Sequence, residues 1–72
     1  MKAVCYSYDK IVGTIHRDGD GRLVVSDPTL APVAEQPLVI GSRTIGPDDD
    51  EFLRNLPVAY SGSYFRIGLE ED

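Results

Sequence analysis

Turn sequences at close intervals divide the first 27 residues into short segments with alternating side chains, a pattern typical of antiparallel β-strands. Residues 2–8 and 11–17 alternate in this way, and only Asp9-Lys10 separates them. Asp18-Gly19-Asp20-Gly21 favours a second tight turn, because glycine accepts a positive φ and aspartate can bond its own backbone. We therefore predict two hairpins that join strands at 2–8, 11–17 and 22–27.

The second half of the chain mixes loop, strand and helix signals. Three prolines predict a connecting loop over residues 28–37, and the apolar run before Gly41-Ser42 predicts a short strand at 38–41. Residues 63–69 return to alternation and predict the last strand.

A short helix is predicted over residues 48–56. Asp48 is a suitable N-cap, Glu51 stands three positions later, and Pro57 lacks the N–H needed to continue a helix. The apolar residues of this range fall on one stripe, so we expect the helix to pack on the sheet.

Together these segments predict an α+β fold that is mostly β. It is a small antiparallel sheet of four to five strands with one short helix, in a single domain over residues 1–72. A chain of this length buries only about 60% of its unfolded surface, and the lone Cys5 cannot form an internal disulfide. We therefore expect association, with other copies or with a partner, to add stability.

Few side chains suggest reactive chemistry. The run Asp18–Gly21 resembles the opening of a calcium loop, but Arg22 occupies a ligand position and Thr29 stands where the closing glutamate belongs. The lone His16 has no recognisable catalytic partner, and we expect Cys5 to be a small buried residue. The sequence therefore predicts a protein without catalytic activity, metal or cofactor.

The charge balance restricts the class of partner. Twelve acidic residues against seven lysines and arginines give a net charge of −5, which opposes direct binding to nucleic acid or anionic membranes. No apolar run is long enough to span a bilayer, and the N-terminus lacks a signal core, so we expect a cytoplasmic location. A protein partner with a basic surface is expected, and a homo-oligomer is possible.

Two kinds of side chain are candidates for binding that partner. Carboxylates in the first turn of the predicted helix and after the last predicted strand could face basic groups, although helix capping and solvation are the simpler explanation. Tyrosines are enriched in interface hot spots, although they are also ordinary strand residues. The candidate residues are Asp48, Asp49, Asp50, Glu51, Tyr60, Tyr64, Glu70 and Glu71.

Residues 1–58 resemble the small N-terminal β-subdomain of HipA-type toxin kinases, which in split systems is a separate antitoxin protein. The matching segments are Val12-Gly13-Thr14-Ile15, the turn Asp18–Gly21 before Leu23-Val24-Val25, Pro37-Leu38-Val39-Ile40, and Phe52-Leu53-Arg54-Asn55-Leu56-Pro57. The resemblance implies a sheet with a capping helix that docks on a kinase-like core and modulates it. It implies no catalytic residue in this chain.

The sequence therefore favours a small acidic module that binds and regulates or inhibits a partner protein, as an antitoxin does. One alternative is a phage or mobile-element inhibitor of the anti-CRISPR type, which would block a basic nucleic-acid groove of a defence complex. A second alternative is a structural or oligomerisation subunit.

Overall fold

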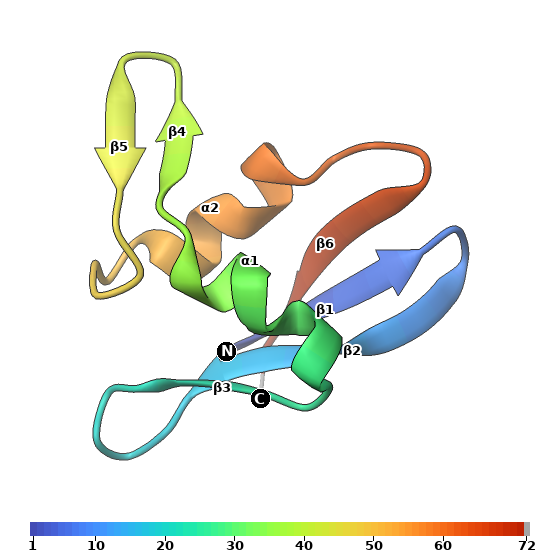
Figure 1. Cartoon of the computed structure of the whole chain (residues 1–72), viewed down its shortest axis with the longest axis horizontal. Coiled ribbons are helices and arrows are strands. Elements are labelled where there is room, and N and C mark those ends of the chain that lie inside the picture. Colours follow the sequence, from blue (N-terminus) through green and yellow to red (C-terminus); the bar gives the residue numbers. More distant parts are fainter. Residues whose placement is uncertain (72) are drawn as a thin grey trace.

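The computed structural model describes residues 1–71 and has an α+β fold that is mostly β, as predicted. Four antiparallel strands form the main sheet in the order β3-β2-β1-β6 (Figure 1). Their bounds are β1 Lys2–Ser7, β2 Lys10–Arg17, β3 Leu23–Val25 and β6 Phe65–Glu70. The predicted strands 2–8, 11–17, 22–27 and 63–69 are thus confirmed, with ends that differ by one or two residues.

The strand register fixes which side chains share a face of the sheet. Ala3 lies opposite Ile15 on β2 and Leu69 on β6, and Cys5 lies opposite Gly13 and Ile67. Cross-strand partners point to the same side, so Ala3, Cys5, Ile15 and Ile67 share the face that packs in the core, while Leu69 at its end is exposed. The register shifts between Cys5 and Tyr6, where Val12 on β2 is the extra residue of a bulge.

The turn between β2 and β3 forms as predicted. The Asp18 carboxylate accepts the backbone N–H groups of Asp20 and Arg22, each at 2.9 Å. Gly21 has φ +80°, a conformation that glycine adopts without steric cost. The aspartate of this turn therefore binds its own backbone.

Residues 28–35 are helical, and the predicted loop over 28–37 is wrong. A 3₁₀ turn spans Pro28–Leu30 and the helix α1 follows at Ala31–Glu35. Both prolines of this stretch lie in the first turn of their helix, where the missing N–H costs nothing. The Asp27 carboxylate accepts the Thr29 N–H and caps the 3₁₀ turn.

The predicted strand at 38–41 exists as β4, Leu38–Ile40, but it does not join the main sheet. It pairs with β5, Arg43–Ile45, which the sequence did not predict. Gly41, with φ +61°, turns the chain between them, so the Gly-Ser pair is a hairpin turn rather than the end of the strand. Figure 1 shows the β4–β5 hairpin projecting away from the sheet.

The predicted helix at 48–56 is shifted toward the C-terminus: α2 spans Phe52–Ala59. Asp48 is not its cap, because the Asp49 carboxylate accepts the Glu51 N–H and the Asp49 carbonyl accepts the Phe52 N–H. Pro57 lies inside the helix rather than ending it. Pro57 cannot donate a hydrogen bond to the carbonyl of Leu53, four residues earlier, and its ring crowds that carbonyl.

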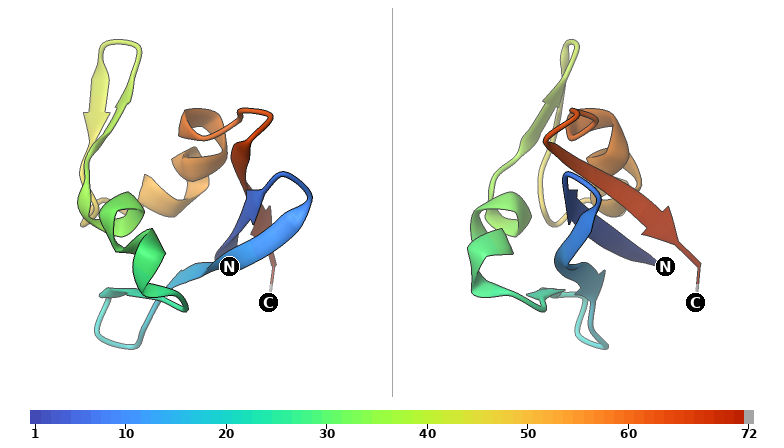
Figure 2. Two further views of the ribbon diagram at one scale, coloured as in Figure 1. Left: turned by 45° about the vertical axis from the view of Figure 1, so that its right-hand side comes forward. Right: turned by 90° about the vertical axis from the view of Figure 1, so that its right-hand side faces the viewer.

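One apolar cluster holds these elements together. Residues 1–71 contain no buried polar or charged side chain. The cluster residues are Ala3, Cys5, Ile15, Leu30, Ala34, Leu38, Ile45, Phe52, Leu53, Leu56 and Ile67. Figure 2 shows both helices on the same side of the four-stranded sheet, so the opposite face of the sheet carries no helix. No helix in the described part of the chain has the length and apolar character needed to cross a membrane.

Candidate protein-binding site

The acidic loop, residues 46–51, precedes α2 and is held in place by one arginine from the main sheet. The Arg17 guanidinium, at the end of β2, donates to the carbonyls of Pro47 at 2.6 Å and Asp49 at 2.7 Å. It also donates to the Gly21 carbonyl at 2.9 Å, within the β2–β3 turn. Arg17 therefore ties two loops together that are distant in sequence, and its donors are used within the protein.

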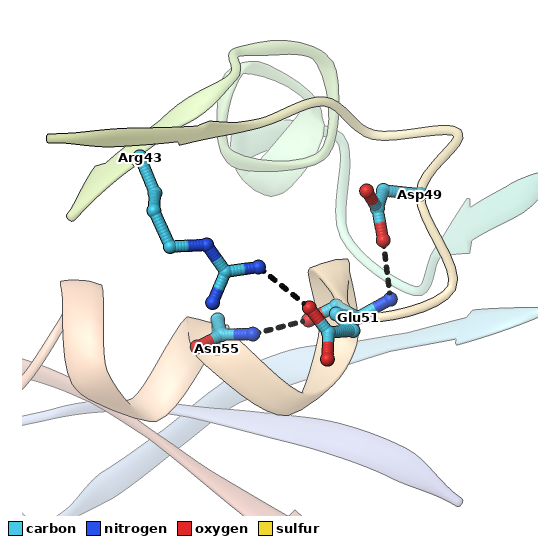
Figure 3. Close-up of polar contacts among 4 residues, drawn as sticks. All are labelled: Arg43, Asp49, Glu51 and Asn55. Atoms are coloured by element: carbon cyan, nitrogen blue, oxygen red, sulfur yellow. Dashed lines mark hydrogen bonds and ion pairs between the residues drawn. The ribbon is translucent and has the colours of Figure 1, made fainter.

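The four predicted carboxylates of this loop have different roles, and Figure 3 shows Asp49 and Glu51. Glu51 pairs with Arg43 of β5 at 2.7 Å, and Asp49 accepts the Glu51 N–H at 2.8 Å. The Asn55 side chain donates to the Glu51 carbonyl. Asp48 and Asp50 are exposed and make no hydrogen bond or ion pair within residues 1–71. Two carboxylates thus shape the loop, and two face solvent.

A groove of about 510 Å³ lies beside this loop. Its apolar wall comes from β3, α1 and the start of the acidic loop, and charged side chains stand around it. The lining residues are Arg17, Arg22, Leu23, Val25, Ala31, Ala34, Glu35, Pro47 and Asp48. The groove therefore brings Asp48 together with Glu35, a carboxylate that no sequence pattern links to Asp48.

We call the surface around this groove the acidic end. It contains seven of the twelve carboxylates of the chain: Asp18, Asp20, Glu35, Asp48, Asp49, Asp50 and Glu51. Three arginines accompany them, which leaves an excess of four negative charges. Since Arg17 and Arg43 are bound within the protein, Arg22 is the cation of this surface whose guanidinium has no partner within residues 1–71.

The predicted tyrosines lie elsewhere and differ from each other. Tyr60 is half-buried and packs edge-on against Phe65, with ring centroids 5.6 Å apart. Its N–H donates to Leu56 and its carbonyl accepts the Ile67 N–H, so it links α2 to β6. Tyr64 is 71% exposed and meets the ring of Tyr8 edge-on at 5.3 Å.

Tyr64 belongs to a second exposed surface, which we call the aromatic patch: Tyr6, Tyr8, Ile11, Tyr64 and Arg66. Tyr6 lies opposite Ile11 on β2 and Arg66 on β6, and the Arg66 guanidinium stacks 4.1 Å from the centre of the Tyr6 ring. Ile11 is 65% exposed and Tyr8 63%. The sequence alone did not assemble this row, because it depends on the register of β1 with two other strands.

Glu70 and Glu71 are exposed and lie apart from the acidic end. Glu70 closes β6 opposite Lys2, at the end of the strand remote from Tyr64. Figure 1 and both views of Figure 2 place this end of β6 away from the loop that precedes α2. The predicted binding residues therefore occupy three separate places: the acidic end, the region of Tyr60 and Tyr64, and the end of β6.

Cys5 lies in the core, as the sequence predicted. Cys5 is fully buried, and this burial raises the pKa of its thiol. His16 is exposed on β2. No group of three or more His, Cys, Asp or Glu side chains in the described range could hold a metal ion.

Comparison with known proteins gave no match, whether to protein-family models, to curated proteins or to solved structures.

Proposed function

We propose that this chain is a small, non-catalytic, acidic module that binds and regulates or inhibits a partner protein in the manner of an antitoxin. The observation that carries the proposal is the acidic end, which gathers seven carboxylates and three arginines on the elements beside a partly apolar groove. Such a surface attracts a partner with a basic surface and repels nucleic acid.

The local pairing of charges supports this use of the acidic end. The exposed ion pair Arg43–Glu51 contributes little to stability. The carboxylates of the acidic end that have no such partner are available to a partner protein. Asp48, Asp50 and Glu35 are exposed around or beside the groove. Long-range attraction from these carboxylates would raise the rate of encounter with a basic protein, and added salt would lower it.

The resemblance of residues 1–58 to the N-terminal subdomain of HipA-type kinases supports a kinase-like partner. In that arrangement the chain docks on the kinase core and restrains it. The lone cysteine is compatible with a reducing compartment, and we propose that the complex forms in the cytoplasm.

Affinity capture from the native host tests the proposal. The tagged chain is expected to retain a kinase-like protein with a basic surface, which mass spectrometry would identify. If that kinase-like protein arrests growth when expressed alone, co-expression of this chain should relieve the arrest. A chain that captures no protein from the host would contradict the proposal. Capture of a nucleic-acid-binding defence complex would instead support the anti-CRISPR alternative.

The aromatic patch favours a second candidate, an oligomerisation subunit. Tyrosine and arginine are among the residue types enriched in interface hot spots, and three side chains of the patch are more than 60% exposed. Size-exclusion chromatography with light scattering decides this point. A dimer or larger species that dissociates on Tyr64→Ser substitution would support the candidate, whereas a monomer at high concentration would exclude it.

A further inference from the structure

The outer edge of β3 has backbone groups available for another strand. Asp18 donates to the Arg22 carbonyl at 2.8 Å, and Ser26 donates to the Thr14 carbonyl at 3.0 Å. Residues of a strand alternate in direction, so Arg22, Val24 and Ser26 face β2 while Leu23 and Val25 turn their N–H and carbonyl groups away from it. Within residues 1–71 these outward groups have no hydrogen-bond partner.

The same two residues line the groove with their side chains. Leu23 and Val25 are half-buried, and Ala31 and Ala34 of α1 face them across the groove. The strand edge and the apolar groove therefore lie side by side. A peptide running along β3 could place alternate side chains in the groove while its backbone bonds to the edge.

We propose that this groove binds an extended basic peptide segment of the partner protein, added as an antiparallel strand to the free edge of β3. This inference rests on the proposed function and specifies how the acidic end recognises its partner. The peptide residues that face β3 would each bond Leu23 or Val25 and insert a branched apolar side chain toward α1. Because β3 has only three residues, the contact would span about five peptide residues.

Charge complementarity identifies the occupant as basic. Glu35 and Asp48 line the groove together with Arg17 and Arg22. Asp49, Asp50 and Glu51 follow Asp48 in the same loop, so the acidic end as a whole keeps its excess of negative charge. Lysine or arginine on either side of the inserted residues would meet these carboxylates. A second copy of this chain would instead bring two acidic ends together, and their repulsion opposes dimerisation through β3.

The direct test uses a synthetic probe and the complete, isotopically labelled chain. The probe is an acetylated and amidated heptapeptide with lysine at both ends, valine at positions three and five, and threonine elsewhere. NMR titration should shift the amide signals of residues 22–26 and 31–35. Shifts confined to the aromatic patch or to β6, or no shift at millimolar peptide, would overturn the inference.

Two altered peptides separate the two parts of the contact. N-methylation of both valines removes the donors that face β3 and should weaken binding about tenfold or more. Glutamate in place of lysine should abolish binding, because it faces the acidic end. Equal binding of all three peptides would show that binding is nonspecific and would contradict strand addition.

A variant of the chain completes the test. Val25→Pro removes the outward N–H while leaving the pairing of β2 and β3 intact, since proline is tolerated on the free side of an edge strand. We expect it to lose the peptide and, in host capture, the partner. If this variant does not fold, Glu35→Gln with Asp48→Asn serves instead, and undiminished peptide binding by that pair overturns the inference.

Failure of this inference can be told apart from failure of the proposed function. If Val25→Pro folds and still captures the partner as the native chain does, strand addition is wrong and the binding function stands. If the native chain binds the probe but captures no host protein, the groove is a peptide site and the proposed function is wrong. Dimers of the native chain that Val25→Pro abolishes would identify the occupant as a second copy.

Discussion

Arg17 links the β2–β3 turn to the acidic loop, 30 residues away in sequence. Its guanidinium serves three backbone carbonyls, which would otherwise lose a charged donor. Arg17→Met should lower the free energy of unfolding by about 2 kcal/mol and shift the amide signals of residues 46–50.

Arg22→Met is the matched control. It removes the same charge from an exposed side chain and should change the free energy of unfolding by less than about 0.5 kcal/mol in urea. An equal loss of stability in the two variants would contradict this explanation, because it would show that the positive charge stabilises the fold and the hydrogen bonds of Arg17 do not.

Gly13 is the position where a single methyl group should disturb the core most clearly. A Cβ atom there would lie 2.6 Å from the Ser26 Oγ and 2.9 Å from the Leu30 Cδ1. The Ser26 hydroxyl accepts the Thr14 N–H, so its displacement also breaks that bond. Gly13→Ala should lower the free energy of unfolding by about 1–3 kcal/mol in thermal or urea denaturation.

Gly19→Ala is the matched control for this change. A Cβ atom at Gly19 meets nothing within 4 Å, so its stability should stay within about 0.5 kcal/mol of the parent chain. A neutral Gly13→Ala variant would contradict the close packing of β2 against the 26–30 segment.

At the scale of elements, α2 contains the clearest local conflict. Pro57 lies within Phe52–Ala59 and cannot donate to the carbonyl four residues earlier. Pro57→Ala restores that bond, and we expect a net gain of about 1 kcal/mol after the greater entropy of the unfolded chain is included. Pro32→Ala changes a first-turn proline of α1 and should bring no gain. Calorimetry of both variants checks the difference, and a gain at both positions would contradict the explanation.

The elements that the sequence predicted are those that local pattern determines. The two-residue alternation of side chains and the turn residues between segments predict β1, β2, β3 and β6, because both signals are local to each strand. The sequence does not predict the helices at 28–35, because a proline inside a helix usually ends it, whereas Pro28 and Pro32 occupy first-turn positions. The sequence does not predict β5, because three residues are too few to show alternation. β5 is a strand because it pairs with β4.

The candidate site was only partly predictable for the same reason. The run Asp48–Glu51 was visible in the sequence, but its neighbours in space come from β2, β3 and α1. Glu35 joins the run only because residues 28–35 are helical and pack beside β3. Glu70 and Glu71, which look equivalent in sequence, lie at another place because β6 runs beside β1.

At the scale of the whole molecule, the acidic end and the aromatic patch lie in different places. The acidic end lies around the β2–β3 turn, α1 and the loop before α2, whereas the aromatic patch occupies the β1–β2 turn and the start of β6. A net charge of −5 spread evenly over the surface would give only weak, nonspecific attraction to basic proteins. Because the carboxylates are concentrated beside the groove, a basic partner is attracted to that part of the surface. Recognition through the acidic end is the central claim for the function.

The most direct test measures the affinity of the captured partner for two charge-matched variants at low and high salt. Asp48→Asn with Asp50→Asn changes two carboxylates of the acidic end, and Glu70→Gln with Glu71→Gln changes two at the end of β6. We predict that the first pair weakens binding about tenfold or more and flattens its salt dependence, while the second leaves both nearly unchanged. Equal effects of the two pairs, or no effect of the first, would contradict recognition through the acidic end.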